Sequence, residues 1–187
     1  MAAAHAAIAS HVDELTELDS AIGDGDHGLN MKRGMDAILA EVDQLAAMPL
    51  SDALGAAGKR LVMTIGGASG PLFATFLNVL GQQLETLKPA QAFVAAVDAV
   101  AKRGKAKQGE KTLLDVLFPL ANALNVRNNC LELALVAGEA ARATIPLQAT
   151  KGRASYLGVR SIGHMDPGAR SVWLIMDAIA SVIGQNR

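Results

Sequence analysis

The stretch GGASGPLFATFLNVLGQQL, residues 66–84, shows the pattern that decides the fold of this chain. A glycine-rich loop is followed by apolar side chains that recur every three or four residues, the spacing of one face of a helix. The same period returns along the chain, and no segment shows strand alternation or a hairpin turn. The sequence therefore predicts eight helices, marked by apolar positions within 8–15, 35–42, 54–65, 73–84, 93–100, 113–120, 131–140 and 172–183.

Short connections between these helices predict antiparallel neighbours, and so an all-α bundle or a closed helical barrel. The length of 187 residues is typical of one domain, spanning 1–187, with a sizeable buried core. Four connections are glycine-rich and polar, namely 24–28, 66–71, 103–105 and 151–168. They follow the first, third, fifth and seventh predicted helices, so an up-and-down arrangement brings them to one end. That end is the expected functional face.

Composition excludes several classes of protein. A formal net charge of −1 leaves no large basic surface for nucleic acid. One cysteine, Cys130, rules out an internal disulfide framework and fits a reducing compartment. Residues 1–10 lack the basic and apolar regions of a signal peptide, and no apolar run is long enough to span a membrane. We therefore expect a cytoplasmic protein without membrane association.

Three aspartates, Asp19, Asp24 and Asp26, fall within eight positions. Carboxylates this close repel one another unless a cation or a proton lies between them, and hard oxygen ligands on a flexible turn suit Mg²⁺ or Ca²⁺. A helix-periodic segment, 31–45, starts just after them, and helix N-termini commonly bind phosphate. Because carboxylates alone would repel a phosphate, the arrangement predicts a site for a metal ion together with a nucleotide.

Residues 23–28 partly resemble two familiar loop motifs, a dinucleotide-binding loop and an EF-hand, but a metal–nucleotide site explains them better. GDGDHG has the glycine spacing of a dinucleotide-binding loop, but no strand precedes it and its aspartates would face the pyrophosphate. The ligand spacing and terminal glutamate of an EF-hand are missing. A single aspartate here would be an ordinary turn residue. Three of them, followed by His27 and Asn30, favour the metal site over a capped turn.

The remaining loops are less specific. The 66–71 loop, with Ser69 and Gly70, fits both a phosphate-binding loop and a tight turn between helices. Arg153 stands in a polar loop where an anion would explain it. Asp166-Pro167-Gly168 has the form of a simple helix start, with an aspartate cap before a proline.

Taken together, the loops resemble those of the nucleotide-binding L subunits of bacterial dihydroxyacetone kinases. The resemblance runs from about residue 12 to the C-terminus and preserves the order of several long motifs. These are LTELDSAIGDGDHGLNM at 15–31, GGASGPLF at 66–73, GEKT at 109–112, KGRASYLG at 151–158, SIGH at 161–164 and DPGA at 166–169. Two departures are Leu113, where methionine is common, and Glu110, where aspartate is usual.

The resemblance implies a barrel of eight antiparallel helices with the nucleotide across one end. It implies that Asp19, Asp24 and Asp26 hold Mg²⁺ on the phosphates of ADP or ATP. Positions matching the family's nucleotide contacts are His27, Gly28, Leu29, Asn30, Ser69, Gly70, Gly104, Leu113, Arg153, Asp166, Pro167 and Gly168.

The implied activity is phosphotransfer in glycerol metabolism. A phosphohistidine-bearing M subunit of the phosphotransferase system recharges bound ADP to ATP, and a K subunit holds dihydroxyacetone. A transcription regulator is a further implied partner, and a homodimer is left open. The alternatives are a subunit of an ATP-dependent kinase for erythrulose or another keto-sugar, a Mg²⁺-dependent phosphohydrolase, and a non-catalytic, nucleotide-loaded partner of a regulator. No arrangement of a covalent nucleophile is apparent, so positioning and charge neutralisation carry the expected chemistry.

Overall fold

The computed structural model describes residues 1–126 and 129–185, and within them all regular structure is helical. The elements are α1 (Ala2–Ala9), α2 (Val12–Ile22), α3 (His27–Leu39), α4 (Val42–Ala46), α5 (Leu50–Thr64), α6 (Ser69–Leu84), α7 (Pro89–Gly104), α8 (Leu114–Leu124), α9 (Cys130–Ala143), the 3-10 helix η1 (Arg153–Ser161) and α10 (Pro167–Gln185). The all-α prediction is confirmed. The predicted count of eight helices is wrong, because the described residues form ten α-helices and one 3-10 helix.

The first predicted helix is divided into α1 and α2 by side chains that compete for a backbone carbonyl. His11 Nδ1 lies 2.7 Å from the oxygen of Ala7, and the Ser10 hydroxyl donates to the same oxygen at 3.1 Å. The His11 N–H donates instead to Ile8, three residues back, at 3.1 Å. Ser and neighbouring polar side chains commonly interrupt helices in this way.

The second predicted helix is divided into α3 and α4 at Glu41. The N–H of Glu41 donates to the oxygen of Ile38, three residues back instead of the four of an α-helix. The Glu41 carboxylate forms an ion pair with Arg60 on α5. The remaining unpredicted element, η1, forms within the 151–168 segment, where the sequence predicts a loop.

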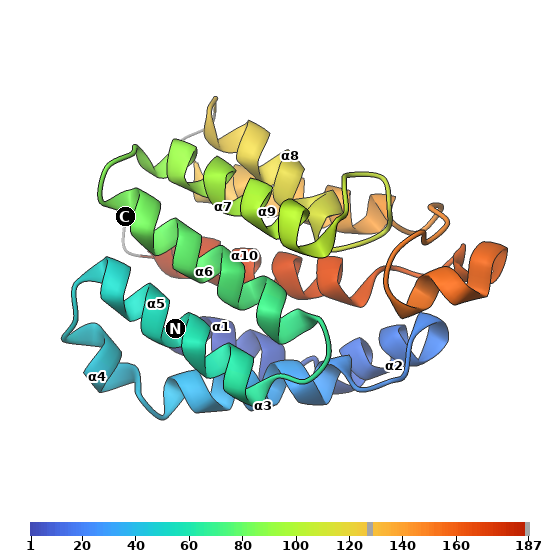
Figure 1. Cartoon of the computed structure of the whole chain (residues 1–187), viewed down its shortest axis with the longest axis horizontal. Coiled ribbons are helices and arrows are strands. Elements are labelled where there is room, and N and C mark those ends of the chain that lie inside the picture. The colour runs from blue at the N-terminus through green and yellow to red at the C-terminus, as the bar shows by residue number, and fades with distance from the viewer. Residues whose placement is uncertain (127–128, 186–187) are drawn as a thin grey trace.

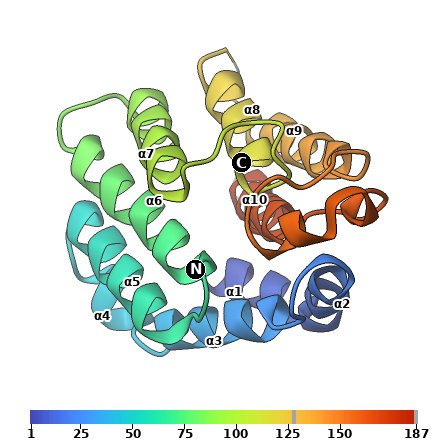
Figure 2. The same cartoon turned by 45° about the vertical axis from the view of Figure 1, so that its right-hand side comes forward.

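The helices close into a barrel, which Figure 2 shows from a view turned toward one end. Around the barrel, each helix contacts the next in the order α1, α3, α5, α6, α7, α8, α9 and α10, and α10 contacts α1 to close the ring. Two apolar clusters fill the interior, one centred on α7 to α10 and the other on α1, α3 and α5. Phe73, from the stretch that reveals the helical period, packs against both clusters and so joins them.

The polar connections after α2, α5, α7 and α9 gather at one end of the barrel, on the right in Figure 1. The predicted convergence of these loops is therefore confirmed. Among the described residues, every helix is too short or too polar to cross a bilayer.

Candidate functional site

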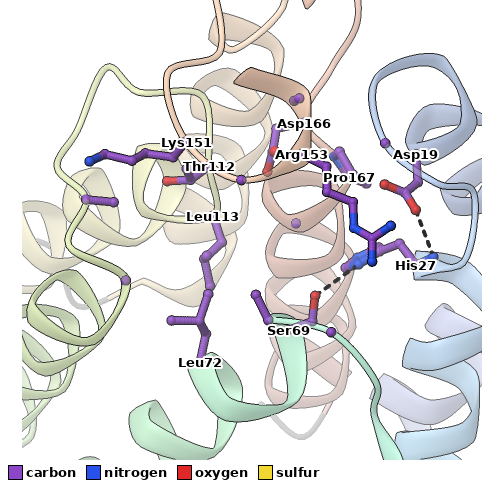
Figure 3. Close-up of a pocket in the computed structure, with 18 of the residues that line it drawn as sticks. Asp19, His27, Ser69, Leu72, Thr112, Leu113, Lys151, Arg153, Asp166 and Pro167 are labelled. Atoms are coloured by element: carbon purple, nitrogen blue, oxygen red, sulfur yellow. Dashed lines mark hydrogen bonds between the residues drawn. The ribbon is translucent and has the colours of Figure 1, made fainter. Parts of the chain in front are cut away.

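A cleft of about 450 Å³ opens between the four converging connections. This volume lies within the range of roughly 300–1,000 Å³ that is usual for small-molecule sites. Figure 3 shows its two contrasting walls: Leu72 and Leu113 face each other on one side, and Asp19 and His27 lie on the other. Val100 and Ala106 extend the apolar wall. Such a cleft suits a molecule with one flat apolar part and, where a cation offsets the carboxylates, one anionic part.

The three predicted metal ligands come together at the polar side of this cleft. One carboxylate oxygen each from Asp19, Asp24 and Asp26 lies within 4.8 Å of the others, with Asp19 buried and the other two exposed. Mg²⁺ binds oxygen at about 2.1 Å, so two of its ligands stand at most roughly 4.2 Å apart. Small rotations of the exposed side chains would bring all three oxygens onto one ion. The residues present therefore fit a hard divalent cation.

The loop that carries these ligands is folded around Asp19. Its Oδ2 accepts the backbone N–H of Asp26 at 2.9 Å and that of His27 at 3.1 Å. A Cβ at Gly23 would stand 2.1 Å from Asp19 Oδ1, and Gly25 has a φ of +74°. Glycine is required at both places, by close approach at the first and by backbone conformation at the second. Asp19 therefore shapes the loop, which leaves Asp24 and Asp26 facing the cleft.

Arg153, at the start of η1, reaches across the mouth of the cleft (Figure 3). Its Nη1 lies 2.5 Å from Asp24 Oδ2. A guanidinium fork is well suited to bidentate contacts with phosphate oxygens. If a cation neutralises Asp24, Arg153 becomes available to such an anion.

His27 connects three helices beneath the aspartate cluster. Its Nε2 lies 2.8 Å from the hydroxyl of Ser171 on α10, and its Nδ1 lies 3.3 Å from the hydroxyl of Ser69 on α6. Burial lowers the pKa of His27, although the carboxylates of Asp19 and Asp26 act in the opposite direction. The ring is therefore a neutral, hydrogen-bonded link between walls of the barrel.

We expect His27 to make the fold sensitive to acid. Below its ordinary pKa of about 6.5 the unfolded chain binds a proton that the folded chain does not, so the free energy of unfolding falls as the pH decreases. The His27→Asn variant lacks this contribution. Urea unfolding at pH 7, 6 and 5 should show the parent losing up to about 1.4 kcal/mol per pH unit more than the variant. Equal losses in the two proteins would contradict the assignment.

Asp166 caps the last helix, as its sequence context predicts. Its Oδ2 accepts the N–H of Ala169 at 2.7 Å, and its own N–H donates to Thr144 Oγ1 at 3.0 Å. Burial raises the pKa of Asp166 to about 7. Near neutral pH this carboxyl is consequently poised between its two charge states at the edge of the cleft.

Most of the residues predicted from the sequence do line the cleft: Asp19, Asp24, Asp26, His27, Ser69, Gly104, Leu113, Arg153, Asp166, Pro167 and Gly168. Four others do not: Gly28, Leu29, Asn30 and Gly70. Their expected contact with nucleotide stays a prediction.

The two glycines of that second group have a packing role. A Cβ at Gly28 would stand 2.1 Å from the oxygen of Val12, where α3 crosses α2. A Cβ at Gly70 would stand 2.6 Å from the oxygen of Ile65, where α6 turns against α5. Leu29 is exposed, and buried Asn30 accepts a hydrogen bond from Arg33.

Apart from Leu113, the sequence alone does not reveal the apolar wall, nor does it reveal Lys111, which also lines the cleft. Val100 belongs to a helix-periodic set, and that period predicts only a place in the core. Lys111 lies within the GEKT motif, but nothing in the local pattern indicates where its side chain points. The motif itself is the one available signal.

A family model described as the DAK2 domain matches residues 21–181. The chain belongs to the DAK2 domain family.

Several relatives of this DAK2 chain have assigned activities. The ADP-binding subunit DhaL of the PEP-dependent dihydroxyacetone kinase of Escherichia coli K12 is 43% identical, over 89% of this chain and 86% of the relative. The PTS-dependent counterpart from Lactococcus lactis is 39% identical, over 90% of this chain and 87% of its own. A D-erythrulose kinase of Mycolicibacterium smegmatis is 36% identical, over 95% of this chain but 33% of the relative.

The fold of the DAK2 chain also matches solved structures. The native dihydroxyacetone kinase of C. freundii superposes with a TM-score of 0.81 at 25% identity, over 96% of this chain and 33% of that one. The same enzyme in complex with AMP-PNP and Mg²⁺ gives a TM-score of 0.80, over 96% of this chain and 32% of that one. The chain thus spans about a third of that enzyme.

Proposed function

We propose that this chain, as one nucleotide-binding domain over residues 1–187, is the ADP-binding, phosphoryl-transferring subunit of a dihydroxyacetone kinase. The observation that carries the proposal is the convergence of Asp19, Asp24 and Asp26 on the polar side of a cleft whose other wall is aliphatic. An adenine base against Leu72 and Leu113 would place its phosphates toward the carboxylates. The DhaL relatives, named as ADP-binding subunits, support this choice of ligand.

Each group of residues has a proposed role. Asp19, Asp24 and Asp26 hold Mg²⁺, which neutralises the charge of the polyphosphate when it is bound. Arg153 supplies a positive charge at the mouth, and the N-terminus of α3, whose His27 N–H is held by Asp19, adds the positive end of the helix dipole. Ser69, whose hydroxyl lies 3.3 Å from His27 Nδ1, offers a further polar contact from the start of α6. Phosphoryl transfer depends mainly on such positioning and charge neutralisation.

The cleft of about 450 Å³ is proposed to be occupied by the nucleotide, so the keto-sugar is proposed to lie on a separate K subunit. A phosphohistidine-bearing M subunit is the proposed donor, consistent with the PEP-dependent and PTS-dependent relatives. Higher identity to these short subunits than to the longer erythrulose kinase favours the separate-subunit arrangement. A regulator that binds the nucleotide-loaded form, and pairing with a second copy, complete the proposed partners.

The test of the nucleotide site is binding of ADP with Mg²⁺. We expect ADP to remain with the purified protein and to stabilise it, by about 2.7 kcal/mol at a hundredfold excess over its dissociation constant. Thermal unfolding with ADP, with and without EDTA, measures the effect and its dependence on metal. Absence of bound nucleotide together with an unchanged melting temperature in ADP and Mg²⁺ would refute the proposal.

The route of the phosphoryl group is a second expectation. The P–N bond of the donor phosphohistidine breaks as a P–O bond forms to the β-phosphate of bound ADP, so no side chain of this chain becomes phosphorylated. Of the four histidines, His27 is buried between two serines and His5 is paired with Asp36. Incubation with a ³²P-labelled M-type donor, followed by mild alkaline denaturation, should leave the label on nucleotide. Stable label on the polypeptide would overturn this route.

A further inference from the structure

Lys111 is a fully buried lysine whose ammonium lies among backbone carbonyls. Its exposed fraction is 1%. Nζ donates to the oxygens of Thr144 at 2.8 Å, Leu147 at 3.0 Å and His164 at 2.5 Å, and a fourth oxygen, that of Ile145, lies at 3.3 Å. An ammonium has only three N–H donors, so the four oxygens share one positive charge. The arrangement resembles the carbonyl cage that replaces the water shell of a monovalent cation.

The four oxygens belong to the two ends of one segment. Residues 144–166, here called the closing segment, leave α9 at Thr144 and return to α10 at Asp166. Its ends are also joined by hydrogen bonds from Gly163 N–H to Ile145 and from Asp166 N–H to Thr144. Lys111 therefore sits at the base of the closing segment, where both ends meet.

The loop that carries Lys111 is itself held in one conformation. Asp115 accepts the N–H of Gly109 at 2.5 Å and that of Thr112 at 2.7 Å, and Lys111 has a φ of +62°. A left-handed backbone at a lysine persists only where its surroundings hold it in place. Burial lowers the pKa of Lys111, while the nearby carboxylates of Asp115 and Asp166 favour its charged form.

This contact joins two parts of the cleft that are distant in sequence. Leu113, two residues after Lys111, forms part of the apolar wall, while the closing segment brings Arg153 to the mouth and ends at Asp166. We propose that Lys111 is a positioning residue whose ammonium acts as a built-in monovalent cation, fixing the closing segment against the apolar wall and so setting nucleotide affinity. This inference rests on the proposed function for its nucleotide readout.

The first test is the Lys111→Met variant, whose unbranched side chain is one atom shorter and lacks the charge and the donors. The matched control is Lys102→Met, at an exposed lysine near the end of α7. In the nucleotide-free protein, amides of 144–166 should exchange with deuterium faster in Lys111→Met and unchanged in the control. The dissociation constant for ADP with Mg²⁺ should rise about tenfold or more, since hydrogen bonds to a buried charge are lost.

Two further measurements apply if Lys111→Met fails to fold. In Lys111→Ala, propylammonium should restore slow exchange and ADP affinity, whereas 1-propanol should not, because only the ammonium supplies charge and three donors. In the parent protein, reductive methylation should modify Lys102 readily and leave Lys111 unmodified.

Unchanged exchange and an ADP affinity within about twofold of the parent in Lys111→Met would overturn the inference, given that buried charged contacts usually contribute more. So would failure of propylammonium in folded Lys111→Ala, or rapid methylation of Lys111. A parent protein that binds no ADP would instead count against the proposed function, and the exchange and methylation results would still decide the role of Lys111.

Discussion

The Asp24→Asn protein is expected to lose Mg²⁺-dependent ADP binding. The substitution preserves shape but removes one negative oxygen from the three that converge at the cleft. Loss of residues that merely support metal ligands lowers metal affinity about 10–100-fold, so loss of a direct ligand should cost at least about 100-fold. The phosphates would then face Asp19 and Asp26 without full compensation. Isothermal titration with ADP and Mg²⁺, and nucleotide retained through gel filtration, measure the loss.

The matched control is Asp98→Asn, an exposed aspartate in the middle of α7 and away from the cleft. Both variants should melt near the parent temperature without nucleotide, because the exposed Arg153–Asp24 pair contributes only about 0–1 kcal/mol. A loss of ADP binding in Asp24→Asn, with ADP binding retained in Asp98→Asn, identifies Asp24 as a metal ligand rather than a structural residue. Full nucleotide retention by Asp24→Asn would show that the metal site is wrongly assigned.

The Gly28→Ala protein is expected to be both less stable and weaker in nucleotide binding. The added methyl group would meet the oxygen of Val12 at 2.1 Å and the hydroxyl of Thr16 at 2.5 Å. Both belong to α2, so the two helices must separate, and overpacking of this kind typically costs about 1–3 kcal/mol. Separation also moves Asp26 and His27 away from Asp19, which holds their N–H groups. Chemical denaturation and ADP titration report the two effects.

Gly55→Ala provides the comparison. Gly55 lies within α5, and its nearest atom to an added Cβ is Asn78 Oδ1 at 3.6 Å, an ordinary contact. Alanine there should stabilise the protein by about 0.4–1 kcal/mol through helix propensity and a less flexible unfolded chain. If both substitutions stabilise the protein to the same extent, the close approach of α2 and α3 at Gly28 is not a constraint on the fold.

The helical class and the end at which the loops meet could be predicted because they depend on local period and on the order of elements. The breaks near His11 and Glu41 could not. The first depends on a side chain taking the carbonyl of Ala7, and the second accompanies an ion pair with Arg60, nineteen residues away. Neither interaction changes the apolar period, so each divided helix has the pattern of a continuous one.

The convergence of the three aspartates could be predicted because they fall within eight positions, Asp19 near the end of α2 and Asp24 and Asp26 in the loop that follows it. Lys111 and the other apolar wall residues, Leu72, Val100 and Ala106, could not, because they reach the cleft only when segments far apart in sequence meet. Gly28 and Gly70 illustrate a different difficulty. The local sequence does not show whether a glycine is needed for close approach of a ligand or of a neighbouring helix. Only the atoms around it in the folded structure distinguish the two cases.

The start of α1 and the end of α10 lie at the end of the barrel that does not contain the cleft, opposite the converging loops (Figure 1). The 19 residues of α10 span about 28 Å. A tether fused at either end of the barrel would need roughly nine extended residues to run back along its flank. An added domain with a shorter tether would stay behind the barrel, so tags, fluorophores or immobilising anchors can be attached at both termini without obstructing the mouth.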